Sequence, residues 1–117
     1  MEGFVRGDVV IIPFPFSDLK GSKRRPALVL AVLPGDDIIL CQVTSRQPKS
    51  DLFVSLSSGD FSSGGLPVNS FIRPDRIFTA DKNIIIRKAG TVKKTVSEST
   101  INMLLEILDG TKNRRGI

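Results

Sequence analysis

The chain has 117 residues, 40% hydrophobic and 25% charged, and its 17 Lys and Arg against 12 Asp and Glu give a formal net charge of +5. This predicts one globular domain, residues 1–117, because domains typically have about 100–150 residues and disordered chains are less hydrophobic. The sequence has no His, Tyr or Trp and one cysteine, which excludes an intrachain disulfide, a Cys/His zinc site, a Ser-His-Asp triad and a ribonuclease built on two imidazoles.

The first half of the chain alternates apolar runs with turn-forming residues, as antiparallel strands do. Residues 8–12 are a β-branched run closed by a proline and predict a short strand, and residues 13–23 predict a long loop. Residues 26–33 are almost continuously apolar, which is typical of a strand buried on both faces. The turn sequence at 34–37 predicts that residues 38–44 return as the second strand of a hairpin.

The second half predicts shorter strands. The candidate strands are residues 51–56, 68–72, 76–79 and 84–92. Residues 57–65 are rich in Ser and Gly and predict a flexible loop.

The hydrophobic period changes near the C-terminus. The apolar residues at helical spacing there are Ile101, Leu104, Leu105 and Leu108. Thr95 and Glu98 have the spacing of a capping box, which predicts a helix over about residues 96–109, and Gly110 is a stop signal just before a basic tail at 110–117. The fold predicted is a small, mainly antiparallel β-barrel over about residues 6–94 with one C-terminal amphipathic helix. Its core is thin, so two copies are expected to pair.

Positive charge is concentrated in three segments. Four cations lie within residues 20–25 without an acid among them, a second run lies in residues 82–94, and the tail adds a third. Two such segments that converged in space would attract a polyphosphate by counterion release. For the second run and the tail, a solvated surface is an equally good interpretation. The first segment differs because it abuts a buried strand.

Arg25 and Thr44 are the candidate reactive pair. Arg25 precedes Pro26, so its backbone is expected to be extended and stiff, and its planar guanidinium matches phosphate oxygens. An ion pair with a carboxylate such as Asp8 is the more common interpretation of a single arginine. However, Pro26 and Thr44 flank the hairpin turn at comparable lengths, which predicts Arg25 and Thr44 at the same end of the barrel. A hydroxyl beside a guanidinium makes a phosphate site.

Two further groups of residues can contribute to binding. Residues 73–76 predict a turn between strands, which is either solvated or adds two cations and one carboxylate to a groove. The phenylalanines expected in loops, where nucleobases can stack, are Phe14, Phe16 and Phe61. Those assigned to the core are Phe4, Phe53, Phe71 and Phe78.

Four motifs in the same order and spacing resemble the MazF/PemK family of toxins over about residues 6–108. They are Arg6-Gly7-Asp8-Val9-Val10, Arg24-Arg25-Pro26-Ala27-Leu28-Val29-Leu30, Val43-Thr44-Ser45, and Ile72-Arg73-Pro74-Asp75-Arg76-Ile77 followed by Thr79 and the terminal helix. The resemblance implies an SH3-like barrel, a homodimer, and a metal-independent, cofactor-free endoribonuclease that cuts single-stranded RNA at short motifs. It also implies an antitoxin that lays an acidic, partly disordered tail across the same surface.

The resemblance places the family's arginine on Arg25 and its threonine on Thr44. For attack of a 2′-OH on the adjacent phosphate, Arg25 would stabilise the phosphorane and Thr44 would donate to a non-bridging oxygen. The base stays open between Asp75 and a solvent water, because a guanidinium rarely accepts a proton. A third alternative is that in-line geometry alone supplies much of the acceleration. The residues expected to contact RNA are Phe16, Ser17, Lys20, Lys23, Arg24, Ser45, Arg46, Arg73 and Arg76.

Two other functions are compatible with the pattern. The related gyrase-poisoning branch uses the same barrel to grip a protein and needs no phosphate clamp. A small basic barrel can also hold nucleic acid without cutting it, including operator DNA together with an antitoxin. No apolar run approaches about 18 residues and the N-terminus does not read as a signal peptide, so a cytoplasmic location without a membrane partner is expected.

Overall fold

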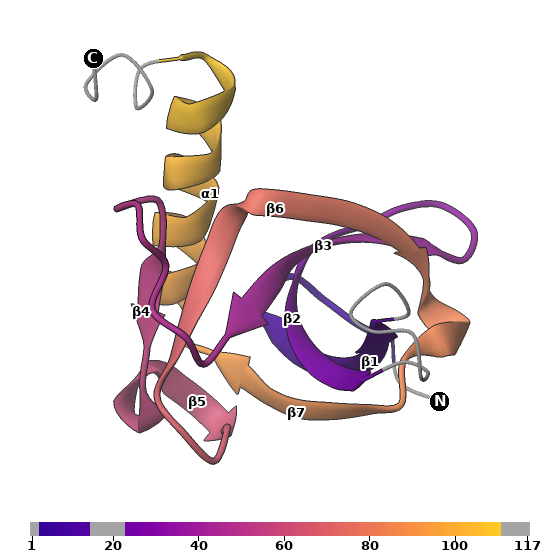
Figure 1. The fold of residues 1–117 in the computed structure, drawn as a ribbon. Helices are drawn as coiled ribbons and strands as arrows, with labels where there is room; N and C mark the ends of the chain where they lie inside the picture. Colours follow the sequence, from indigo (N-terminus) through magenta and orange to yellow (C-terminus); the bar gives the residue numbers. More distant parts are fainter. Residues whose placement is uncertain (1–2, 15–22, 111–117) are drawn as a thin grey trace.

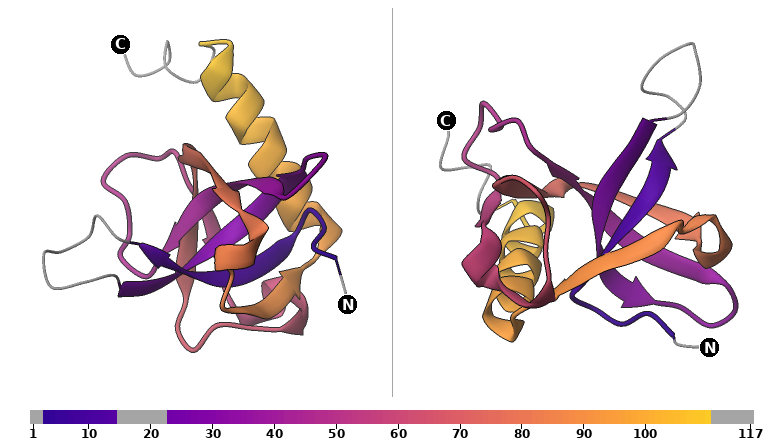
Figure 2. Two further views of the ribbon diagram at one scale, coloured as in Figure 1. Left: turned by 90° about the vertical axis from the view of Figure 1, so that its right-hand side faces the viewer. Right: turned by 90° about the horizontal axis from the view of Figure 1, so that it is seen from below.

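The fold is a curled antiparallel sheet with one helix, as seen in a computed structural model that describes residues 3–14 and 23–110 (Figure 1). The strands are β1 (Asp8–Phe14), β2 (Lys23–Val32), β3 (Asp37–Thr44), β4 (Val54–Leu56), β5 (Phe61–Gly64), β6 (Ser70–Asp81) and β7 (Arg87–Val92); the helices are the short η1 (Ser58–Asp60) and η2 (Lys82–Ile84) and the C-terminal α1 (Lys94–Leu108). The strand order is β4-β6-β3-β2-β1-β7-β5. The sheet curls into a half-barrel and α1 lies beside it (Figure 2), which confirms the predicted fold class.

Both faces of the central strands are buried. Val9 and Val10 are neighbours in β1 but belong to different hydrophobic clusters, because successive strand residues point to opposite faces. Ile101 and Leu104 of α1 pack on the cluster that contains Val9. Phe78 packs on the other cluster. The continuous apolar run at 26–33 is therefore covered on both sides over residues 27–30, whereas Val32, at the end of β2, is exposed.

The first hairpin is longer than predicted. β1 continues through Pro13 to Phe14, and β2 already begins at Lys23, within the predicted loop. Proline is tolerated at position 13 because the ladder between β1 and β7 ends at Ile11, so this part of β1 is an edge strand. Arg24 and Arg25 consequently stand on a paired strand.

The predicted turn at residues 73–76 is wrong, because β6 runs unbroken from Ser70 to Asp81. On β3, Cys41 pairs with Ile77 and the next residue, Gln42, pairs with Arg73, so the residues between Arg73 and Ile77 have no partner there. They form a bulge. A bulge accommodates Pro74, which has no N–H to donate, and explains why turn-forming residues occur inside a strand.

The predicted flexible loop at residues 57–65 is also wrong, since it forms η1 and β5. The Ser57 N–H donates to Asp60 Oδ2 at 2.8 Å and fixes the first turn. Phe61 is buried and pairs with Val92 of β7. Nearby predictions need shorter bounds: of residues 51–56 only Val54–Leu56 is a strand, and residues 84–92 divide into the end of η2 and strand β7.

The phenylalanines are mostly core residues. Phe14 is buried and meets Phe78 edge-on at 5.5 Å between ring centroids, so its predicted place in a loop is wrong, as it is for Phe61. Phe53 and Phe71 form a second edge-on pair at 5.3 Å. Phe4 packs against the cluster that holds Phe14. These rings stabilise the sheet.

The C-terminal helix is present but its start differs from the prediction. Its N-cap is Lys93 without a side-chain cap, so Thr95 lies inside the first turn and the predicted capping box is wrong. Glu98 instead reaches Lys94 Nζ at 4.0 Å. The helix ends at Leu108 and Gly110 follows with φ +84°, the left-handed conformation expected of a helix-ending glycine. Within residues 3–14 and 23–110, no helix is both long and apolar enough to cross a membrane.

Candidate functional site

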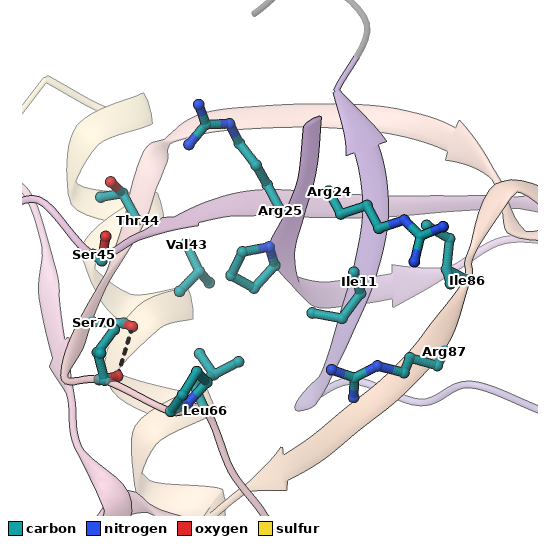
Figure 3. A pocket seen from close by; sticks show the side chains of 13 residues that line it. Ile11, Arg24, Arg25, Val43, Thr44, Ser45, Leu66, Ser70, Ile86 and Arg87 are labelled. Atoms are coloured by element: carbon teal, nitrogen blue, oxygen red, sulfur yellow. Dashed lines mark hydrogen bonds between the residues drawn. The ribbon is translucent and has the colours of Figure 1, made fainter. Parts of the chain in front are cut away.

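The ends of β2 and β3 bring Arg25 and Thr44 to one rim of the sheet. The ladder pairs Leu28 with Cys41 and Ala27 with Gln42, and continuing it leads to Arg25 on one strand and Thr44 on the other. The two side chains stand at the same side of a hollow in Figure 3. Counting residues from the hairpin turn was therefore sufficient to place them together.

Three residues, Arg25, Thr44 and Ser45, are shared by two hollows. The first, here the apolar hollow, has a volume of about 400 Å³. It is lined by the apolar residues Ile11, Pro26, Val43, Leu66, Pro67, Val68 and Ile86, and by Arg24, Arg25, Arg87, Thr44, Ser45 and Ser70. The second, here the polar hollow, has a volume of about 430 Å³ and is lined by Phe14, Arg25, Gln42, Thr44, Ser45, Arg46 and Arg76. Arg25 and Thr44 thus lie between two open sites.

The Arg25 guanidinium is not neutralised by a carboxylate within the part of the chain that the structure describes. The predicted alternative partner, Asp8, is buried elsewhere. It accepts hydrogen bonds of 2.9 Å from the Val5 N–H and from Thr91 Oγ1, and it pairs with Lys88 Nζ at 3.4 Å. Arg25 therefore keeps its donors for a ligand.

The Thr44 hydroxyl is oriented by its own turn. Its Oγ1 accepts a hydrogen bond of 3.2 Å from the Arg46 N–H. A hydroxyl has one proton and two lone pairs, so accepting from the backbone leaves the proton to donate to something else. The residues that follow β3 thus hold this oxygen at the rim.

Arg87 is the cation that sequence reasoning missed. It begins β7 and pairs with Ile11, which pairs on its other side with Pro26, so the second basic segment reaches the apolar hollow across β1. In Figure 3, Arg87 extends towards the hollow from the side opposite Thr44.

Other cations of the same segment are engaged elsewhere. Lys82 lies 3.7 Å from Asp36, Lys88 pairs with Asp8, and Lys94 pairs with Glu98. In the linear sequence the run looks uniform, and only strand pairing distinguishes Arg87 from its neighbours.

The remaining predicted residues separate into three groups. Ser45, Arg46 and Arg76 line the polar hollow and Arg24 lines the apolar hollow, whereas Lys23, exposed at the start of β2, lines neither. Arg73 and Asp75 also line neither hollow. The predicted residues Phe16, Ser17 and Lys20 lie outside the residues that the structure describes.

Asp75 is held by its own strand. Arg73 donates to both of its carboxylate oxygens, at 3.2 and 2.8 Å. Burial, with a smaller contribution from the charge of Asp75, raises the pKa of the Cys41 thiol far above its usual range. Cys41 is therefore a neutral core thiol. Among the residues that the structure covers, no cluster of His, Cys, Asp or Glu is arranged to hold a metal ion.

A protein-family model matches most of the chain. Residues 5–108 match the family model described as PemK-like, MazF-like toxin of type II toxin-antitoxin system. No curated protein sequence matches the chain.

Several solved structures share the fold. An endoribonuclease in complex with its cognate antitoxin, from a mycobacterial species, is 18% identical with a TM-score of 0.70, over 92% of this chain and 96% of that one. MazF (Form-I) from Deinococcus radiodurans is 23% identical with a TM-score of 0.70, over 90% and 96% of the two chains. The Mycobacterium tuberculosis toxin MazF-mt6 is 14% identical with a TM-score of 0.69, over 87% and 96%.

Proposed function

The chain belongs to the PemK-like, MazF-like toxins of type II toxin-antitoxin systems, and on that premise we propose that it is a metal-independent endoribonuclease that cuts single-stranded RNA at short motifs. One observation carries the proposal: Arg25 and Thr44, on neighbouring strands, line the same two hollows. A fork of guanidinium donors beside an oriented hydroxyl suits a phosphate. Proteins of the same fold include two mycobacterial endoribonucleases.

The reaction is attack of a ribose 2′-OH on its adjacent phosphorus. The new 2′-O–P bond forms as the P–O5′ bond breaks, which leaves a 2′,3′-cyclic phosphate and a 5′-OH end. Arg25 stabilises the charge that accumulates on the phosphorane, and Thr44 donates its proton to a non-bridging oxygen and positions the phosphate. Because Asp75 is held by Arg73 outside both hollows, the 2′-OH proton passes to a solvent water. The leaving O5′ takes up a proton from solvent, which gives the 5′-OH. DNA, which lacks the 2′-OH, is not cut.

The same surface suits an acidic inhibitor. Five arginines line the two hollows: Arg24, Arg25, Arg46, Arg76 and Arg87. An antitoxin segment rich in Asp and Glu that lay across them would occupy the phosphate sites and block RNA by charge complementarity. The mycobacterial endoribonuclease with 18% identity was solved with its cognate antitoxin. The toxin works in the cytoplasm, where its substrate is found, and as a homodimer.

The test compares cleavage of a long single-stranded transcript in EDTA by the wild type, Arg25→Ala and Thr44→Val. Removing one well-placed donor to the developing charge should lower the cleavage rate by about 10²–10³-fold. Lys49→Ala is the matched control, because Lys49 is exposed and lines neither hollow; it should cut like the wild type. Equal cleavage by the wild type and Arg25→Ala would remove the site assignment.

A further inference from the structure

We propose, on the basis of the ribonuclease function above, that Gln42 selects the base on one side of the cleaved phosphate and favours a keto base, uracil or guanine. The inference begins from the position of the phosphate anchor. Arg25 and Thr44 are common to both hollows, so a phosphate held by them lies between the hollows. The two nucleotides joined by that phosphate then have one hollow each.

The side chain of Gln42 faces the polar hollow. Residues two apart on a strand share a face, so Gln42 and Thr44 point the same way, whereas Cys41 and Val43 belong to the hydrophobic cluster on the opposite face. Gln42 pairs with Ala27 on β2. The Ala27 side chain ends at Cβ and is fully buried, so it offers the glutamine amide no hydrogen-bonding partner.

The amide of Gln42 is available to a ligand. Gln42 is half-buried, and within residues 3–14 and 23–110 no protein group hydrogen-bonds to its side chain. A primary amide presents an acceptor and a donor side by side, so it can make two hydrogen bonds to the edge of an unstacked base. The polar hollow thus places a group that can recognise a base, the Gln42 amide, next to the proposed phosphate site at Arg25 and Thr44.

The other charged groups of the hollow favour a keto base. Uracil and guanine each place a ring N–H beside a carbonyl, so the ring N–H can donate to Gln42 Oε1 while the carbonyl accepts from Nε2. Arg46 and Arg76, which line the same hollow, have only donors and add to the attraction for a carbonyl oxygen. The amide alone pairs equally well with the amino edge of adenine or cytosine, so the selection comes from Arg46 and Arg76, towards which those bases would turn an amino donor.

The experiment maps cut sites on one long transcript of mixed sequence for the wild type, Gln42→Leu, Gln42→Glu and the control Gln47→Leu. Gln47 is exposed and lines neither hollow, so its variant should keep the wild-type motif. The wild type should require uracil or guanine at one of the two nucleotides next to the cut. Gln42→Leu should lose that preference by about 5–150-fold, the range expected for one bidentate base contact. Gln42→Glu, which only accepts, should discriminate against uracil and retain guanine, whose ring N–H and amino group both donate.

The outcomes separate this inference from the function on which it rests. If the wild type and Gln47→Leu cut RNA and both Gln42 variants keep the same motif, the inference is overturned and the ribonuclease function stands. A wild-type motif without a keto base on either side of the cut also overturns it. If the wild type cuts no RNA, both the Gln42 inference and the ribonuclease function are refuted. Thermal unfolding of each variant checks its fold, and if Gln42→Leu does not fold, Gln42→Ala, for which the same loss of preference is expected, decides.

Discussion

Replacing Arg87 with alanine should weaken RNA binding and make it less sensitive to salt. Five arginines line the two hollows, and Arg87 comes from β7, which is separated by β1 from the strands on or next to which the others lie. Each phosphate neutralised on a single strand contributes about −0.7 to the slope of log Kobs against log salt concentration. If all five are engaged, the slope is about −3.5 and affinity falls about 100-fold between 50 and 200 mM salt. Without Arg87 the slope should be about −2.8 and the fall about 50-fold.

Fluorescence anisotropy with a 2′-O-methyl RNA measures these slopes, because that RNA binds but lacks the free nucleophile. Lys93→Ala is the control, since it removes the same charge from an exposed residue outside both hollows and should leave the slope at its wild-type value. If Arg87→Ala leaves the slope unchanged, or if Lys93→Ala lowers it equally, the convergence of the two basic segments on the RNA is refuted.

Two further predictions concern stability. Asp8→Ala should lower the free energy of unfolding by about 3 kcal/mol, because a buried carboxylate loses two hydrogen bonds, from the Val5 N–H and Thr91 Oγ1; a urea titration that shows a loss below about 1 kcal/mol would contradict this estimate. Cys41 should resist iodoacetamide at pH 8 in the folded protein and react once the protein is unfolded, because burial and then Asp75 raise the pKa of its thiol. Above about pH 9, its ordinary value, the unfolded state releases this proton and the folded state keeps it. Stability should then fall by about 1.4 kcal/mol per pH unit, relative to Cys41→Ala, and an equal pH slope in that variant would refute the assignment.

Local sequence signals were sufficient for the centre of the fold. The hairpin of β2 and β3 combines an uninterrupted apolar run with a turn at 34–37, and both are read from neighbouring residues. The positions of Arg25 and Thr44 follow from that hairpin by counting. The turn was enough to place both residues at one end of the hairpin, whereas the exact pairing also depends on a register shift between Val29 and Ala31 that the sequence did not predict.

Non-local pairing explains what the sequence did not predict. Pro74 and Asp75 are typical of turns and equally of bulges, and only the ladder with β3 decides between them. Phe61 lies in a Ser- and Gly-rich segment whose order depends on pairing with β7. Arg87 reaches the hollow through the pairing of β1 with β7, which joins residues from opposite ends of the chain. No local sequence feature marks Gln42 as a binding residue, because its role depends on the hollow that surrounds it in the fold.

The strand order has a consequence for how such a toxin can be inhibited. β2 and β3 are each hydrogen-bonded on both sides, by β1 and β6 as well as by each other, whereas the sheet ends in the short strands β4 and β5. Fraying begins at such margins and reaches doubly paired strands last. Arg25 is paired with β1 and Thr44 with β6, so melting that is confined to β4 and β5 leaves both residues in place. An inhibitor has to cover these side chains, because unfolding of the outer strands alone would leave the toxin active.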